Sequence, residues 1–80
     1  MTSEKIRKGD LVIVSGLSEL EGKACIIIKG PYPTVLISEK SGFTFSEETM
    51  AADLMCNGEI YPKIKTAFLF KIMNIMNDRL

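Results

Sequence analysis

The chain has 80 residues, a hydrophobic fraction of 46% and a charged fraction of 25%, which are ordinary values for a folded globular protein and argue against extensive disorder. Ten basic residues balance ten acidic ones, so the overall charge does not by itself favour a polyanion or a membrane surface. This length predicts a single domain, 1–80, whose small core would gain stability from self-association or from a partner.

Location is indicated by what the chain lacks. No apolar run approaches the roughly 18 residues of a membrane span, and residues 1–9 lack the apolar core of a secretory signal. Cys25 and Cys56 form neither a CxxC pair nor a disulfide framework, and we interpret them as small buried hydrophobic residues. We therefore expect an intracellular, cytoplasmic protein.

The N-terminal half predicts a β-meander over residues 9–45, preceded by a flexible basic arm over residues 1–8. Runs rich in β-branched residues at 11–14, 23–29 and 34–38 predict three strands. Two prolines in residues 30–33 predict a turn, and residues 39–42 predict a hairpin leading into Phe43 and Phe45. Such a meander can curl into a small barrel.

The C-terminal half predicts helices. Ser46 followed by two glutamates resembles an N-capped helix start, and Asn57-Gly58 resembles a helix stop, so we expect a short helix over 46–58. Apolar residues spaced by three and four predict a C-terminal helix over 63–78, with a strand at 66–72 as the alternative. The apolar stripe of that helix consists of Ile64, Phe68, Ile72, Ile75 and Met76.

Two detailed expectations follow for the meander. Gly22 is expected to have a positive φ angle in the turn between the first two strands. Alternating β-branched residues are expected to fill the core. These residues are Val12, Val14, Ile26, Ile28, Val35 and Ile37.

Residues 8–28 resemble the KOW motif of ribosomal proteins and NusG-like transcription factors. The matching features are Lys8-Gly9-Asp10, the alternating valines at 12 and 14, Gly16, and Gly22 before a second apolar strand. The resemblance implies a small antiparallel SH3-like barrel, so the expected fold class is mainly β, an SH3-like barrel plus one or two C-terminal helices. It also implies a nucleic-acid partner, for which the candidate residues are Lys5, Arg7, Lys8 and Lys23.

Catalytic function is not expected. The chain has no histidine, which excludes His-based acid–base catalysis, His-ligated zinc and Ser-His or Cys-His nucleophile pairs. Its glycines form neither a GxGxxG motif nor a P-loop, and Glu47-Glu48 is better explained as a helix start than as a catalytic pair. We therefore expect no enzyme activity, cofactor, metal or small-molecule substrate.

Protein contacts are the favoured function. Tyr32 lies between two prolines, and Leu69, Phe70 and Met73 widen the apolar face of the predicted C-terminal helix beyond what a small barrel covers. These four residues are the candidate interface for a protein partner or for self-association. The chain is thus expected to be a small regulator or adaptor, with a viral accessory factor as one hypothesis. The alternative is a KOW-type DNA- or RNA-binding protein linked to transcription or translation.

Overall fold

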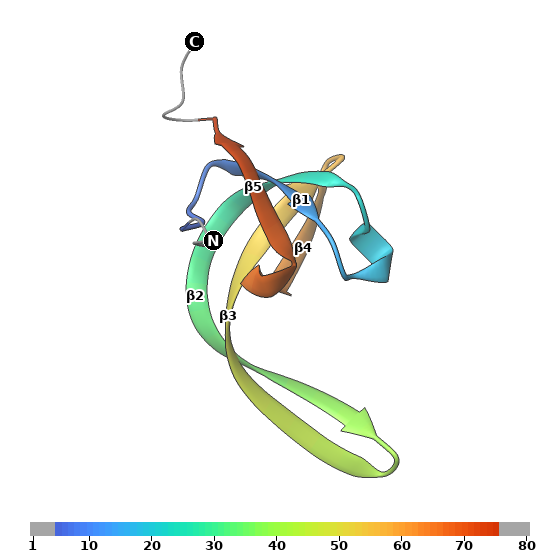
Figure 1. Ribbon diagram of the computed structural model, residues 1–80. Coiled ribbons are helices and arrows are strands. Elements are labelled where there is room, and N and C mark those ends of the chain that lie inside the picture. Colours follow the sequence, from blue (N-terminus) through green and yellow to red (C-terminus); the bar gives the residue numbers. More distant parts are fainter. Residues whose placement is uncertain (1–4, 76–80) are drawn as a thin grey trace.

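The computed structural model of this protein describes residues 5–75, which fold into one antiparallel sheet of five strands (Figure 1). Their order in the sheet is β4-β3-β2-β1-β5, so the first strand pairs with both the second and the last. The elements are β1 (Asp10–Val14), the 3-10 helix η1 (Ser18–Leu20), β2 (Ala24–Lys40), β3 (Phe43–Cys56), β4 (Glu59–Lys65), the 3-10 helix η2 (Thr66–Phe68) and β5 (Leu69–Asn74).

The core forms where the strands send alternate side chains to one side of the curled sheet. Val12 and Val14 of β1 are fully buried, as the sequence predicted. In β2 the buried residues are Cys25 and Ile27, so the expected burial of Ile26 and Ile28 is wrong. The prediction was displaced by one position, and a displacement of one residue along a strand exchanges the two faces of the sheet. The core cluster consists of Val12, Val14, Leu20, Cys25, Ile27, Ala52, Leu54, Cys56 and Leu69.

β2 and β3 are much longer than the other strands, and their ends leave the rest of the molecule as a two-stranded arm (Figure 1). We call this arm the ribbon and define it as residues 32–40 and 43–51, which pair without interruption; the remainder is the body. The molecule is consequently elongated, with extents of 51 × 26 × 23 Å. The expected burial of Val35 and Ile37 is wrong because both lie on the ribbon, 49% and 71% exposed.

Residues 30–33 do not form the predicted turn. They continue β2, whose pairing with β3 shifts register between Ile27 and Lys29 and again between Lys29 and Tyr32. Proline is tolerated at such irregular positions and at strand edges, because no ladder hydrogen bond is lost there. Irregularities of this kind bend a strand, which accounts for the way in which the ribbon leaves the body.

The predicted C-terminal helices are wrong. Residues 46–56 belong to β3, which pairs with β2 and β4, while residues 63–74 form the end of β4, η2 and β5. Between residues 5 and 75 the helical elements are the two short 3-10 turns. The alternative of a strand at 66–72 is closer to the structure, since β5 begins at Leu69. Residues 76–78 of the predicted helix and 1–4 of the predicted arm lie outside the described residues.

Candidate functional site

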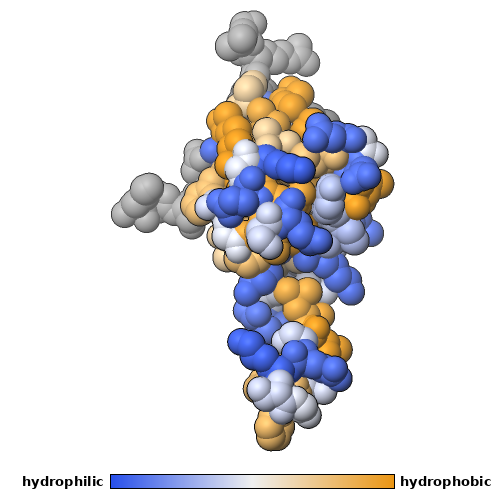
Figure 2. Space-filling view, turned by 90° about the vertical axis from the view of Figure 1, so that its right-hand side faces the viewer, coloured by the Kyte–Doolittle hydropathy of each residue, from blue (hydrophilic) through white to orange (hydrophobic). Residues whose placement is uncertain are grey.

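The ribbon exposes apolar side chains on both of its faces. Cross-strand pairing puts Leu36, Phe43 and Phe45 on one face, and Val35 and Ile37 on the other together with Met50. Phe43 is 69% exposed and Phe45 52% exposed. Figure 2 shows apolar side chains on the ribbon, clear of the body. Scattered exposed apolar residues are ordinary, whereas a gathering of them on one projecting element indicates a binding surface.

The ribbon also has free backbone edges. Within residues 5–75, residues 32–40 pair with β3 and have no other strand partner, and residues 43–50 pair with β2 alone. Strand edges of this kind present unpaired N–H and C=O groups in a regular row. The ribbon can therefore accept an added strand on either side.

The base of the ribbon is held by Tyr32 and Asp53. The Tyr32 hydroxyl donates a hydrogen bond to the Asp53 carboxylate, and the Lys63 backbone N–H donates to the same oxygen at 3.1 Å. The bond from Tyr32 lowers the pKa of Asp53 and raises the pKa of Tyr32. Tyr32 is half-buried. Through the shared Asp53 carboxylate, this candidate interface residue connects β2 to β3 and β4.

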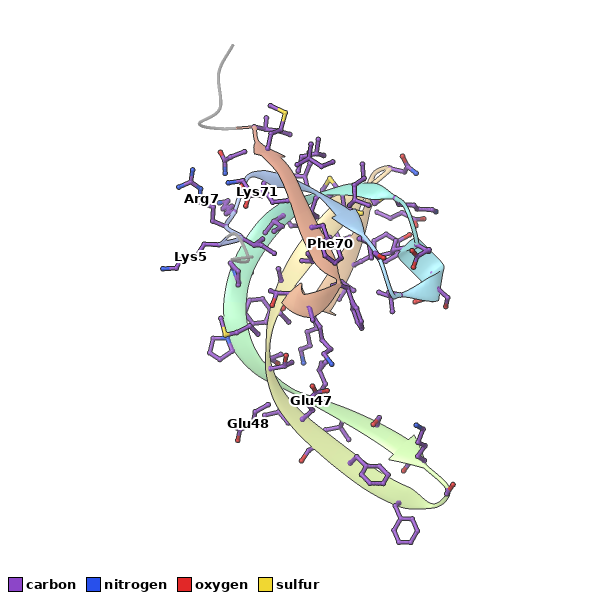
Figure 3. All side chains as sticks on the ribbon, viewed as in Figure 1. Lys5, Arg7, Glu47, Glu48, Phe70 and Lys71 are labelled. Carbon is purple, nitrogen blue, oxygen red and sulfur yellow. The ribbon has the colours of Figure 1, made fainter. Side chains whose placement is uncertain are left out.

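A second link joins the ribbon to the body. Lys65 of β4 lies 3.0 Å from the Glu47 carboxylate, and its amine is 5.6 Å from the centre of the Phe68 ring. Glu48, the next residue, points to the other side of β3 (Figure 3). The two glutamates, which the sequence suggested as a helix start, thus belong to opposite faces of a strand.

The candidate nucleic-acid residues only partly come together. Lys5, Arg7 and Lys71 line one shallow depression on the body and lie on the same side in Figure 3, and the exposed Lys8 follows directly in the chain. Lys23 lies at the far end of β1, where its backbone oxygen accepts from Val14 N–H at 3.1 Å. Sequence reasoning therefore identified Lys5, Arg7 and Lys8 of this basic cluster, and the structure adds Lys71 to it.

Buried Asp10 organises this basic cluster from beneath. Its carboxylate accepts a hydrogen bond from the Arg7 backbone N–H at 2.9 Å and one from the Asn74 amide at 2.7 Å. The Lys71 amine lies 3.8 Å from the same carboxylate. Asp10 is completely buried, so its negative charge is enclosed by donors from both ends of the chain.

The apolar candidates in β5 separate into different environments. Leu69 is 5% exposed and belongs to the core, where it pairs with Val14 across the β1–β5 ladder. Phe70 is 57% exposed and Met73 is half-buried. The alternation follows from the strand, because neighbouring residues point to opposite faces. Phe70 is the one of these three that offers a largely open side chain.

Cys25 and Cys56 are buried free thiols, and burial raises the pKa of Cys25 to about 11. The Glu21 carboxylate accepts a hydrogen bond from the Gly16 N–H at 2.7 Å and so closes the loop after β1. Residues 5–75 hold no group of three or more histidine, cysteine or acidic side chains arranged to bind a metal.

Comparisons with protein-family models, curated proteins and solved structures gave no match for this chain. The described part of the chain contains no helix with the length and apolar character needed to cross a membrane.

Proposed function

We propose that this chain is a non-catalytic protein-binding module, a regulator or adaptor, and that the ribbon is its binding element. The observation that carries the proposal is the combination of exposed apolar side chains and free strand edges on an arm outside the core. A two-stranded ribbon is only marginally stable by itself in water, so a partner that covers it supplies burial that the body does not.

Capture experiments with matched variants test this function. Ile37→Ser combined with Phe45→Ser removes two exposed side chains of the ribbon, one from each face. Ile60→Ser is the control, because Ile60 is 57% exposed but lies on β4, outside the ribbon. The proposal expects the ribbon variant to unfold like the parent while losing the proteins that the parent and the control retain. Identical capture by all three chains would contradict it.

Nucleic-acid binding is the second candidate function, and the basic cluster of Lys5, Arg7, Lys8 and Lys71 favours it. The proposed relationship to KOW-type, SH3-like domains is supported by the positive φ of Gly9 and Gly22 and by a first strand that pairs with the last, as in a meander curling toward a barrel. We include a cytoplasmic location in the proposal, on the basis of the two free cysteines.

A salt titration separates this candidate from the first. Replacement of Lys5, Arg7 and Lys8 by alanine is expected to weaken DNA or RNA binding and to reduce the salt dependence by about one unit per lost phosphate contact. Absence of binding by the parent chain at low salt would exclude this candidate and leave the ribbon proposal untouched.

A further inference from the structure

The outer edge of β2 has the features of a self-complementary surface. We propose that two copies of the chain form a two-fold symmetric dimer in which residues 32–40 of each copy pair antiparallel, with the axis passing at Leu36. The inference rests on the proposed function and deepens it, because it names a second copy as the occupant of the ribbon edge.

The position of the axis follows from the pairing of β2 with β3. That pairing is uninterrupted from Tyr32 to Lys40, and Leu36 is the central residue of this stretch. Closed dimers are two-fold symmetric and use the same surface on both copies, so an antiparallel strand pair must place one position opposite itself. Centring on Leu36 uses the whole regular stretch without an unpaired overhang.

The chemistry of the segment is symmetric about the same residue. Thr34-Val35-Leu36-Ile37-Ser38 has a hydroxyl residue at each end and three aliphatic residues between. In the proposed register Val35 lies opposite Ile37 of the second copy, and Thr34 lies opposite Ser38. A Thr–Ser pair directly across a ladder stabilises it by roughly 0.2–1 kcal/mol, and the aliphatic pair buries apolar surface that is exposed in the single chain.

Charge separates this edge from the other edge of the ribbon. Residues 34–38 carry no charge, whereas the stretch of β3 that pairs with β2 alone, residues 43–50, has Glu47 and Glu48 near its centre. Symmetric pairing along β3 would put Glu47 directly opposite its own copy with the axis at Glu47, and diagonally across from its own copy with the axis at Ser46. Like charges at such positions repel one another. The β2 edge is therefore the edge that accepts an identical strand.

The ends of the proposed ladder also match. Lys40 lies opposite Tyr32 of the second copy, whose hydroxyl is bonded to Asp53, so an amine approaches a carboxylate at both ends of the interface. Pro33 has no N–H to donate to β3, which favours its backbone facing the outer side of the strand; it then leaves one hydrogen bond to Glu39 of the second copy unmade at each end of the ladder. By alternation Val35 and Ile37 also direct their backbone groups outward. These are the residues that exchange hydrogen bonds between copies.

The size of the interface sets the expected affinity. A pair of short strands with few flanking contacts falls at the low end of specific interfaces, below about 1,200 Å². We therefore expect a reversible dimer with a dissociation constant on the order of 1–100 µM rather than a permanent one.

The body of the second copy lies beyond the tip of the first ribbon, because the paired strands run in opposite directions and each ribbon projects from its own body (Figure 1).

A charge exchange tests the register by analytical ultracentrifugation of the full chain from about 1 to about 500 µM. Thr34→Glu with Ser38→Glu places like charges opposite one another and is expected to weaken the dimer at least tenfold, as is the corresponding double lysine variant. An equimolar mixture of the two variants is expected to restore dimers. The control for the double lysine variant is Thr44→Lys with Ser46→Lys, which puts the same charges on β3, opposite Glu39 and Ile37, and is expected to leave the dimer intact.

Cross-linking tests the axis. In the Leu36→Cys variant the two introduced thiols of the dimer face each other. Oxidised glutathione is expected to join them in a disulfide and to be reduced to two molecules of glutathione. This disulfide should form faster than the one between two copies of the control variant Ser46→Cys. A parent chain that stays monomeric throughout, a mixture that fails to restore dimers, or equal cross-linking in both variants would overturn the inference. If the parent chain is monomeric but the variant Ile37→Ser with Phe45→Ser loses the captured proteins, the proposed function survives and another protein occupies the ribbon. If the parent is monomeric and this variant captures the same proteins as the parent, the dimer and the proposed function are both wrong.

Discussion

Removal of the buried carboxylate of Asp10 is expected to be the most damaging polar substitution in the body. Asp10→Ala deletes the acceptor for the Arg7 N–H and the Asn74 amide and removes the charge beside Lys71. A hydrogen bond to a charged group contributes about 1.5–3 kcal/mol, and breaking a buried charged pair costs about 3–5 kcal/mol. We therefore expect about 3–5 kcal/mol of destabilisation, a large part of the stability of a domain of this size.

Urea unfolding with two companion variants tests this value. Asp10→Asn keeps one oxygen acceptor but turns an amide toward one of the two donors, so it should lose about half as much stability. Glu39→Ala removes an exposed carboxylate at the ribbon tip and should change stability by less than about 0.5 kcal/mol. If Asp10→Ala were as stable as Glu39→Ala, the account of Asp10 as the organiser of the basic cluster would be wrong.

Three further outcomes are expected. Leu54→Ala, at a fully buried position, should cost about 2–5 kcal/mol in urea unfolding, whereas a loss below about 1 kcal/mol would contradict the packing described for β3. Gly22→Val should cost about 1–3 kcal/mol through its φ of +75° alone, because a Cβ there meets nothing within 4 Å, and Gly22→Asn should cost much less. The pKa of Cys25 is raised to about 11, so this thiol should react with a disulfide reagent at pH 8 on the order of 100-fold more slowly in the folded chain than after unfolding; equal rates would show that the thiol is accessible. The same raised pKa gives a contribution to stability that is complete below the unfolded pKa of about 8.5 and is lost as pH rises through about 11.

Local signals predicted the first strands well. The run at 11–14 is β1, the expected positive φ of Gly22 is confirmed, and the hairpin expected at 39–42 turns at Ser41-Gly42, both with positive φ. These features depend on residues close together in the chain, such as a β-branched run between glycines, so sequence reasoning can reach them.

The helices were predicted wrongly because the same residues satisfy two patterns. Asn57-Gly58, interpreted as a helix stop, is a two-residue hairpin turn between β3 and β4, with φ angles of 53° and 81°. Ala52, Leu54 and Cys56 fill the core with the period of two that a strand requires. Only pairing with distant partners, such as Leu36 with Glu47, decides between the two patterns, and such pairing leaves no local signal.

The hairpin at the tip of the ribbon was predicted, but the projection of the ribbon from the body was missed for a related reason. Composition counts Val35, Ile37, Phe43 and Phe45 as hydrophobic residues available for a core, but strand pairing carries them away from the body. The ladder between β3 and β4 ends at Ala51 and Lys65, so β3 continues as the ribbon without that neighbour. Core packing therefore gives no account of the apolar side chains beyond that point. Their exposure is explained if they contact another chain, and the uncharged, self-matching edge of β2 makes an identical chain the first partner to test.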